Sequence, residues 1–479
     1  MDVKQNNSQT FETEKKPSRK VCVLGLGFVG SAMATVLASV KAENGERIYD
    51  VIGIDLPNKQ GKARVNALNA GIFPFDCSDQ HLVSKTKNCV DEGNLAASTD
   101  ERLISGADIV LVDINMNVTL SSTGAVADFE SFEKAIISIG RNIQPGAIVI
   151  IETTVPPGTC EKFVTQILQE QLVARGLSIN DVYLAHSYER VMPGPQYLHS
   201  ITNYWRVYSG LTDEAKSKCA EFLSSFIDVE AFPLICLSTM TASETAKIIE
   251  NTYRAVNIAL MDEWGKFAED IGVDAFEVID AIKQRPTHRN IMRPGLGVGG
   301  YCLTKDLLFG EVSMREFFYE NENSFLLSKL AHRINQNMPL RNVERLRSFL
   351  NDTLDHKRLL IMGVAYRSEV GDTRYSAVEK FFDEAVAQGA KVMLHDPFVG
   401  FWNEKQLEVP TDIPEIRDID AVVFAVPHEM YKTMDVLDWL GAKRPLVYDC
   451  DNVLPSFEIS KLRRAGVSVA ATGSAGLVS

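Results

Sequence analysis

The chain has 479 residues, of which 45% are hydrophobic and 23% charged, and its formal net charge is 49 − 63 = −14. This composition is ordinary for a globular protein and excludes collagen, a coiled coil and wholesale disorder, while the length predicts two or three domains. Nucleic acids and most membrane surfaces are polyanions, so an acidic chain is a poor partner for either, and we expect neither.

Residues 1–18 show no apolar periodicity, and we expect them to form a disordered tail. The first twenty residues are too polar for a signal peptide, and no apolar run approaches the roughly 20 residues of a membrane span. The eight cysteines contain no C-x-x-C pair, which argues against a zinc site. We therefore expect a cytoplasmic protein without a metal ion.

Short apolar runs alternate with helical stretches through the first part of the chain. The runs lie at 21–25, 51–55, 107–114 and 146–154, and the helical stretches at 31–42, 82–93, 128–141 and 159–175. Short β-branched runs that alternate with helices predict a parallel sheet covered on both faces.

The middle of the chain, from 211 to 340, has a helical period. Its clearest segment runs from Ser243 to Asp270 without a proline, and Thr241 with Glu244 is a candidate capping box. From about 358 the α/β rhythm returns. The sequence thus predicts an α/β protein with two doubly wound Rossmann-like domains joined by a helical domain with a long central helix. The expected boundaries are 1–18, 19–210, 211–340 and 341–479.

A glycine motif follows the first apolar run. Gly25, Gly27 and Gly30, with Phe28 and Val29 between them, fit G-x-G-x-x-G and open a helix, and Asp55 ends the next strand. In this setting the glycines allow a tight turn and close approach of a pyrophosphate, and the acidic residue binds ribose hydroxyls. A carboxylate repels the 2′-phosphate of NADP, so we expect NAD. The alternative is a glycine turn in an unrelated α/β protein.

The densest chemical signal is the segment 293–306, RPGLGVGGYCLTKD. Its four glycines exclude a regular helix or strand and allow close contact with a ligand. Lys305 and Asp306 lie within four residues of Cys302, where a cation favours the thiolate and a carboxylate orients a base or a water. A lone cysteine is also common as a small core residue, so this loop alone leaves both readings open.

Two groups of polar residues flank this loop in the sequence. Glu244, Lys247, Asn251 and Arg254 share one face of the long helix, and a lysine with an amide in register suits the stabilisation of an oxyanion. A basic cluster, Arg285, His288, Arg289 and Arg293, is suited to a phosphate. By periodicity alone, a solvated helix face and a solvated helix end are the alternatives.

Together these motifs resemble the nucleotide-sugar 6-dehydrogenases, which include the UDP-glucose, UDP-N-acetylglucosamine (UDP-GlcNAc) and UDP-N-acetylmannosamine (UDP-ManNAc) dehydrogenases. The resemblance runs from about residue 20 to 465. It rests on GLGFVG (25–30), TTVPPGT (153–159), YERVMPG (188–194), AKIIENTYRAVNIALMDE (246–263), PGLGVGGYCLTKD (294–306) and GVAYRSEVGDTRYSA (363–377).

The resemblance implies a role for each matching residue. Cys302 is the implied nucleophile, Lys247 and Asn251 the oxyanion pair, Asp306 the carboxylate for proton transfer or water, and Glu189 a candidate for hydrolysis. The implied NAD set is Gly25, Gly27, Phe28, Val29, Gly30, Asp55, Glu152, Lys305 and Arg374. The implied UDP-sugar set is Arg190, Val191, Arg289, Arg293, Gly299 and Arg367, with the Arg289 loop acting within the chain or across a dimer.

The implied reaction is a four-electron oxidation of C6 of a UDP-sugar, through an aldehyde, a thiohemiacetal on Cys302 and a thioester. The implied first domain binds NAD, the helical domain forms a homodimer, and the last domain binds the UDP-sugar. An acidic uronate product suits surface-polysaccharide synthesis. The Arg190-Val191-Met192-Pro193 segment favours UDP-GlcNAc or UDP-ManNAc over UDP-glucose.

The chain departs from the family pattern at three places. Met116 stands where members have a threonine, which Asn115, Asn117 or a water could replace; Tyr188 stands for a proline; and Ala377 ends a motif that usually ends in proline. Two other functions stay open: a two-electron β-hydroxyacid dehydrogenase, which releases one NADH per turnover rather than two, and an inactive nucleotide-sugar-binding protein.

Overall fold

The computed structural model describes residues 18–121, 124–318 and 325–474. The tail predicted at 1–18 thus lies outside the described residues except for Ser18, whose hydroxyl binds Asp50. In the described ranges, no helix is both long enough and apolar enough to cross a membrane.

An eight-stranded sheet forms the first part of the molecule, in the order β10-β9-β8-β7-β4-β1-β2-β3. The strands are β1 (Arg19–Leu24), β2 (Tyr49–Ile54), β3 (Leu95–Ser98), β4 (Ile109–Val112), β7 (Ile148–Ile151), β8 (Tyr183–His186), β9 (Val207–Gly210) and β10 (Ile235–Cys236). All neighbouring strands are parallel except β8 and β9. The strand order switches at β1, because β2 and β3 follow on one side of it and β4 lies on the other. Dinucleotides bind at such switch points.

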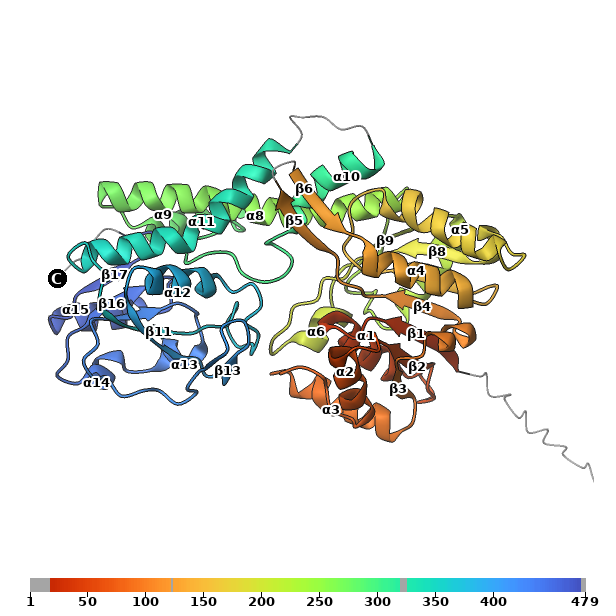
Figure 1. Cartoon of the computed structure of the whole chain (residues 1–479), viewed down its shortest axis with the longest axis horizontal. Coiled ribbons are helices and arrows are strands. Elements are labelled where there is room, and N and C mark those ends of the chain that lie inside the picture. Colours follow the sequence, from red (N-terminus) through yellow and green to blue (C-terminus); the bar gives the residue numbers. More distant parts are fainter. Residues whose placement is uncertain (1–17, 122–123, 319–324, 475–479) are drawn as a thin grey trace, which may run out of the picture.

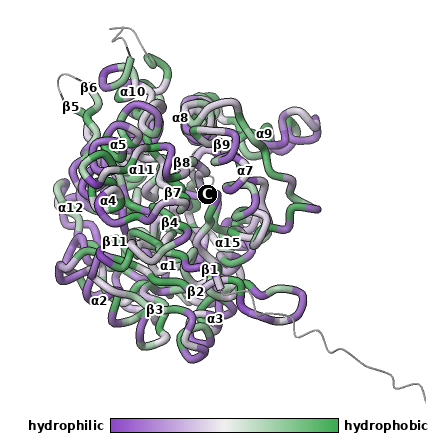
Figure 2. Tube along the Cα trace, turned by 90° about the vertical axis from the view of Figure 1, so that its right-hand side faces the viewer, coloured by the Kyte–Doolittle hydropathy of each residue, from purple (hydrophilic) through white to green (hydrophobic). Residues whose placement is uncertain are grey.

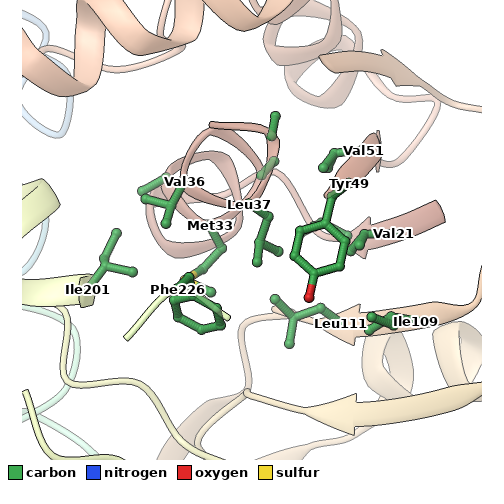
Figure 3. Packing of buried hydrophobic residues seen from close by; sticks show 14 of the residues in the cluster. Val21, Met33, Val36, Leu37, Tyr49, Val51, Ile109, Leu111, Ile201 and Phe226 are labelled. Atoms are coloured by element: carbon green, nitrogen blue, oxygen red, sulfur yellow. The ribbon is translucent and has the colours of Figure 1, made fainter. Parts of the chain in front are cut away.

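Side chains that alternate along these strands enter two separate cores. Val21 and Leu111 pack on the face covered by α1, with Met33 and Leu37, whereas Cys22 and Val112 pack on the opposite face. Figure 3 shows the first of these cores. The helices of this part are α1 (Phe28–Ala38), α2 (Lys59–Asn69), α3 (Gln80–Asp91), α4 (Glu130–Asn142), α5 (Thr165–Val173), α6 (Tyr197–Thr202) and α7 (Asp213–Ser224). The helix α4 buries Phe132, Ile136 and Ile139 on one face, as expected of an amphipathic helix, and Figure 2 shows hydrophilic and hydrophobic segments mixed along the tube around it.

The long helix α8 (Met240–Ile271) extends along both α/β parts in Figure 1. Its cap is Thr239, whose side chain accepts a hydrogen bond from the Ala242 amide, so the predicted capping box of Thr241 and Glu244 is wrong. The Glu244 carboxylate instead accepts hydrogen bonds from the Gly158 and Cys160 amides, which fixes α8 to the segment that follows β7. Further helices, α9 (Ala275–Lys283), α10 (Phe309–Phe317) and α11 (Leu326–Phe349), complete this region, and β5 (Asn117–Ser121) pairs with β6 (Gly124–Asp128) beside α10.

A second, five-stranded parallel sheet follows, in the order β12-β11-β15-β16-β17. Its strands are β11 (Arg358–Met362), β12 (Lys391–His395), β15 (Ala421–Phe424), β16 (Leu446–Asp449) and β17 (Val469–Ala471). Its helices are α12 (Ala377–Ala387), α13 (Glu429–Thr433), α14 (Val436–Leu440) and α15 (Ser456–Arg464), and β13 (Phe401–Trp402) with β14 (Leu407–Glu408) forms a small hairpin. Figure 1 shows the two α/β parts on either side, under the helices α8 and α11. The predicted fold class is thus confirmed.

The domain boundaries at 18/19, 210/211 and 340/341 stay a prediction. α7 packs on β9, and β10 joins the first sheet, although both lie after residue 210. We propose the division at 340/341 within α11, which connects the helical region to the second α/β part.

Candidate active site

A cavity of about 840 Å³ lies between the two α/β parts and α8. Its wall includes Gly27, Phe28 and Val29 from the glycine motif, Lys247 and Asn251 from α8, 297–303, Lys305 and Asp306 from the cysteine loop, and Arg367 and Arg374 from the second α/β part. All three regions of the chain therefore contribute to one space, which is large enough for a nucleotide and a sugar.

The cysteine loop is held just before Cys302 by contacts with both α/β parts. Gly300 has a φ of +84° and packs against the Tyr366 ring, where an added Cβ would lie 2.9 Å from a ring carbon. The Tyr301 hydroxyl donates a hydrogen bond to the Met116 carbonyl over 2.9 Å and contacts the Asn117 side chain at 3.0 Å. The loop therefore presents Cys302 from a position fixed by both α/β parts.

The thiol of Cys302 is accessible from the cavity, whereas five of the other seven cysteines are buried. The surrounding protein and the charge of Asp306 raise its pKa to about 12, although Lys247 and Lys305 act in the opposite direction. The sequence-based expectation that a nearby cation favours the thiolate is therefore only partly right. Two cations lower the pKa of this thiol, but desolvation by the surrounding protein and a carboxylate outweigh them.

Lys247 and Asn251 lie one turn apart on α8 and face the loop. The Lys247 ammonium donates to the Glu189 carbonyl over 2.8 Å and lies 3.4 Å from the Glu189 carboxylate. Burial alone would lower the pKa of Lys247, but the negative groups around it, Glu189 first, raise it, so the lysine is charged. The Asn251 amide donates to the buried Asp306 carboxylate over 2.7 Å. The site thus offers a fixed cation and an oriented amide beside the thiol.

Lys305 makes its shortest contact with Asp306, over 2.8 Å, and its ammonium lies 4.4 Å from the centres of the Tyr301 and Phe309 rings. Asp306 is therefore held by Asn251 from one side and by Lys305 from the other. These two contacts fix the orientation of the Asp306 carboxylate at the end of the loop.

The glycine motif has the features of a pyrophosphate site. Gly25 has a φ of +93°, and an added Cβ there would meet the Asp113 carbonyl at 2.3 Å, whereas a Cβ on Gly27 would meet nothing within 4 Å. Gly27 caps α1 without a side-chain hydrogen bond, so backbone N–H groups at the helix N-terminus stay available for an anion. Asp55 is buried at the end of β2 and accepts two hydrogen bonds from Arg64, at 2.7 and 3.1 Å. These residues fit a dinucleotide.

A buried cluster of three ionisable side chains lies next to this motif, and the sequence did not predict that these three residues meet. Glu152, which follows β7, accepts a hydrogen bond from Arg206 over 2.6 Å, and both side chains are 2% exposed. Asp113, which follows β4, has a buried carboxyl oxygen close to Glu152. Of these three residues, only Glu152 was predicted as part of the site. Nothing in the local sequence around Asp113 or Arg206 indicates that the strands β4, β7 and β9 bring the three side chains together.

The predicted substrate residues divide into two sets. Arg190, Val191, Gly299 and Arg367 line the cavity, but Arg289 and Arg293 do not: both are exposed, and Arg293 pairs with Asp280 over 2.6 Å. Within one chain the basic loop is thus outside the site.

Arg374 reaches from the second α/β part to the glycine motif. Its guanidinium pairs with Asp372 and lies 4.3 Å from the centre of the Phe28 ring.

Met116 occupies the position at which the family has a threonine. It is 1% exposed and packs in the core under the cavity, whereas the neighbouring Asn115 is exposed on the cavity wall. Asn117 is engaged by Tyr301. Of the two asparagines, Asn115 lines the cavity and Asn117 does not.

Three models of one protein family match successive parts of the chain. The NAD binding domain of the UDP-glucose/GDP-mannose dehydrogenase family matches residues 19–226, its central domain 241–337 and its UDP binding domain 360–456. Among curated relatives, the UDP-N-acetyl-D-mannosamine dehydrogenase of Methanocaldococcus jannaschii is 28% identical over 442 residues, which are 91% of this chain and 93% of the relative.

Solved structures agree with these matches. The UDP-D-ManNAc dehydrogenase of Pyrococcus horikoshii has a TM-score of 0.78 at 27% identity, with 95% of this chain and 99% of that chain covered. The NDP-N-acetyl-D-galactosaminuronic acid dehydrogenase of Methanosarcina mazei has a TM-score of 0.75 at 27% identity, with 97% of each chain covered.

Proposed function

Because the chain belongs to the UDP-glucose/GDP-mannose dehydrogenase family, and is thus an NAD-dependent nucleotide-sugar dehydrogenase, we propose that it oxidises C6 of a UDP-N-acetylhexosamine to the carboxylate. The observation that carries this proposal is the position of Cys302 on the cavity wall, beside Lys247 and the Asn251–Asp306 pair. The thiol is the discriminating group, because a two-electron dehydrogenase forms no acyl intermediate and needs no nucleophile in its cavity.

The first oxidation converts the C6 alcohol to an aldehyde and releases a hydride and a proton. NAD, when bound, accepts the hydride in this oxidation and again in the second. The Lys247 ammonium and the Asn251 amide hold the C6 oxygen, on which negative charge develops as the proton leaves. Asp306, oriented by Asn251 and Lys305, is the candidate acceptor of that proton.

Cys302 then adds to the aldehyde. Its sulfur bonds to C6, and the thiol proton moves to the former carbonyl oxygen, which gives a neutral thiohemiacetal. This order suits a thiol whose pKa is raised to about 12, because the proton leaves sulfur only as the bond to carbon forms. Loss of the second hydride and of the hydroxyl proton gives the thioester.

Water cleaves the thioester to the carboxylate and returns the thiol. Glu189 is the candidate group that activates this water, because its carboxylate lies on the cavity wall 3.4 Å from the Lys247 ammonium. The ion pair with the ammonium holds the Glu189 side chain at the cavity, where it is the proposed acceptor of a proton from water.

The proposed sugars are UDP-GlcNAc and UDP-ManNAc, with UDP-glucose as the alternative. Support comes from Arg190 and Val191, which line the cavity after Glu189, and from relatives named UDP-N-acetyl-D-mannosamine dehydrogenases that are 27–29% identical. Arg367 and Gly299 are the proposed further contacts of the UDP-sugar.

The test is the number of NADH molecules released per UDP-sugar consumed, with UDP-GlcNAc, UDP-ManNAc, UDP-GalNAc and UDP-glucose as substrates. Two NADH with one N-acetylhexosamine, and a uronate by mass spectrometry, support the proposal. One NADH per turnover contradicts the four-electron reaction. Tight UDP-sugar binding without NADH favours an inactive binding protein.

We also propose that two copies of the chain pair through α8. Large apolar side chains form one exposed stripe at helical spacing along this helix. They are Ile249, Tyr253, Leu260, Trp264, Phe267 and Ile271, each at least 50% exposed. A stripe of this length supports a self-complementary contact, and Arg289, at the end of the adjacent helical segment, is then the proposed contact with the partner's substrate.

Light scattering tests this pairing with Trp264→Glu, and Val173→Glu on α5 is the control because Val173 is a similarly exposed apolar residue outside the stripe. We expect a dimer for the parent and for the control, and a monomer for Trp264→Glu. A parent that is a monomer at micromolar concentration would contradict the proposal.

A further inference from the structure

Two carboxyl groups occupy the ends of adjacent strands under the glycine motif. Asp113 follows β4 and Glu152 follows β7, which pair in parallel, so both side chains lie at the same edge of the sheet. Both line the cavity. The Asp113 Cβ lies 3.2 Å from where a Cβ on Gly30 would sit, which places this carboxyl directly against the start of α1.

The charges around this pair do not balance if both groups are ionised. Arg206 donates to Glu152 and to the Tyr188 carbonyl, at 2.6 and 2.9 Å, and no ion pair between Asp113 and a cation is found among the described residues. Glu189 adds a further negative charge, which Lys247 compensates. The Tyr197 hydroxyl, also near Asp113, donates to the Phe28 carbonyl. A second carboxylate is therefore left without a countercharge.

The hydrogen bonds point to the same conclusion. One buried oxygen of Asp113 and one of Glu152 have no donor among the described residues. Two such oxygens satisfy each other only when one carries a proton. Burial raises the pKa of both groups. Burial and the charge of Glu152 raise the pKa of Asp113 well above its ordinary value, whereas Arg206 opposes the rise for Glu152 and stabilises its charged form. The proton thus belongs on Asp113.

We infer that Asp113, as a neutral acid that donates to Glu152, accepts a hydrogen bond from the nicotinamide-ribose half of NAD. Its remaining oxygen is available to the cavity, because no described donor contacts it. Dinucleotides bind across the switch point of such a sheet. Asp55, on the β2 side, is therefore placed to bind the adenosine half, and the ends of β4 and β7 are placed to bind the nicotinamide half. The donor is a ribose hydroxyl or the carboxamide N–H of the nicotinamide.

This inference goes beyond the proposed reaction and does not depend on the sugar, because its readout is binding of NAD alone. Asparagine has the shape and hydrogen-bonding groups of a protonated aspartate: its N–H₂ donates to Glu152 and its oxygen accepts from the ligand. Asp113→Asn therefore retains the proposed contact, and Asp113→Ala removes it.

Calorimetry at pH 7 measures the Kd of NAD, ADP-ribose and ADP for both variants. We expect Asp113→Asn to bind NAD within threefold of the parent and Asp113→Ala to bind it at least tenfold more weakly, with ADP unchanged in both. ADP lacks the nicotinamide and its ribose, so unchanged ADP binding separates a ligand contact from a general disturbance. Weakened ADP-ribose assigns the contact to the ribose, and unchanged ADP-ribose assigns it to the carboxamide.

The matched control is Asp108→Asn, because Asp108 directly precedes the same strand at the opposite edge of the sheet. We expect all three ligands to bind this variant as they bind the parent. Three results would overturn the inference: Asp113→Asn as weak for NAD as Asp113→Ala, Asp113→Ala equal to the parent, or ADP weakened together with NAD.

Discussion

The side-chain amide of Asn251 donates a hydrogen bond to the carboxylate of Asp306 over 2.7 Å, which joins the middle of α8 to the cysteine loop. Asp306 is fully buried and also pairs with Lys305. Its carboxylate is therefore fixed by two donors before a substrate arrives, and the amide that would hold the C6 oxygen is fixed at the same time. Preorganised groups of this kind stabilise charge without rearrangement during the reaction.

Asn251→Ala tests this arrangement. The substitution removes one oxyanion donor and frees one side of Asp306, so we expect kcat to fall by about 10²–10³ while the Kd of the UDP-sugar changes little. Initial-rate kinetics and calorimetry measure the two quantities. Asn257→Ala, on the same helix but outside the cavity wall, is the control and should retain kcat. An Asn251→Ala enzyme with the parent's kcat would place this amide outside the reaction.

Cys302→Ala tests the nucleophile. Without the sulfur no thioester forms, so we expect uronate formation to be lost while the UDP-sugar still binds with nearly the parent Kd. Mass spectrometry of the products and calorimetry give the two readouts. Cys236→Ala, which removes another exposed cysteine, should behave as the parent. Uronate production at the parent rate by Cys302→Ala would contradict the assignment of Cys302 as the nucleophile.

The pH dependence of thiol alkylation follows from the raised pKa of Cys302. Because this pKa is about 12, the thiolate fraction grows roughly tenfold per pH unit between pH 7 and 10, and the rate of iodoacetamide modification should rise in proportion. After the desolvation of the thiol by the surrounding protein, Asp306 is the largest cause of the shift, so Asp306→Asn should lower the pKa of Cys302 and speed its alkylation although it slows turnover.

Peptide mass spectrometry that follows the Cys302 peptide measures these rates, with Asp280→Asn as the control because Asp280 is an exposed carboxylate paired with Arg293. A rate that is flat between pH 7 and 10 would show that Cys302 is already a thiolate. A slower rate in Asp306→Asn would contradict the proposed electrostatic effect.

Features encoded in short segments were predictable from the sequence. The glycine motif combines a strand, a turn and a helix start within a few residues, and the cysteine loop combines its glycines, thiol and charges within 293–306. The alternation of apolar runs and helices predicted the α/β, helical and α/β order, and the family matches confirm the resemblance on which the finer reading depends.

Contacts between distant segments were not predictable in this way. Glu244 matches the local pattern of a capping box, but it caps the segment after β7 because tertiary contact places two free amides beside it. Arg206 and Glu152 are 54 residues apart and meet only because β9 and β7 share a sheet. The exposure of Arg289 likewise depends on how α9 and the loop after it pack, which a cluster of basic residues does not reveal.

Asp55→Ala tests the choice of NAD over NADP. The Asp55 carboxylate is paired with Arg64, so its removal eliminates a charge that repels a 2′-phosphate and also releases a guanidinium that can bind one. We therefore expect the Kd of NADP divided by the Kd of NAD to fall by at least tenfold, because NADP binds more tightly and NAD more weakly. Calorimetry with each dinucleotide measures the ratio.

The double variant Asp55→Ala with Arg64→Ala separates the two effects. Since both the carboxylate and the guanidinium are absent from it, NADP should bind more weakly than it binds the single variant, while NAD binding stays the same in both. If the ratio in Asp55→Ala equals that of the parent, the carboxylate does not contact the adenosine ribose, and Asp55 then serves only to hold Arg64 against the end of β2.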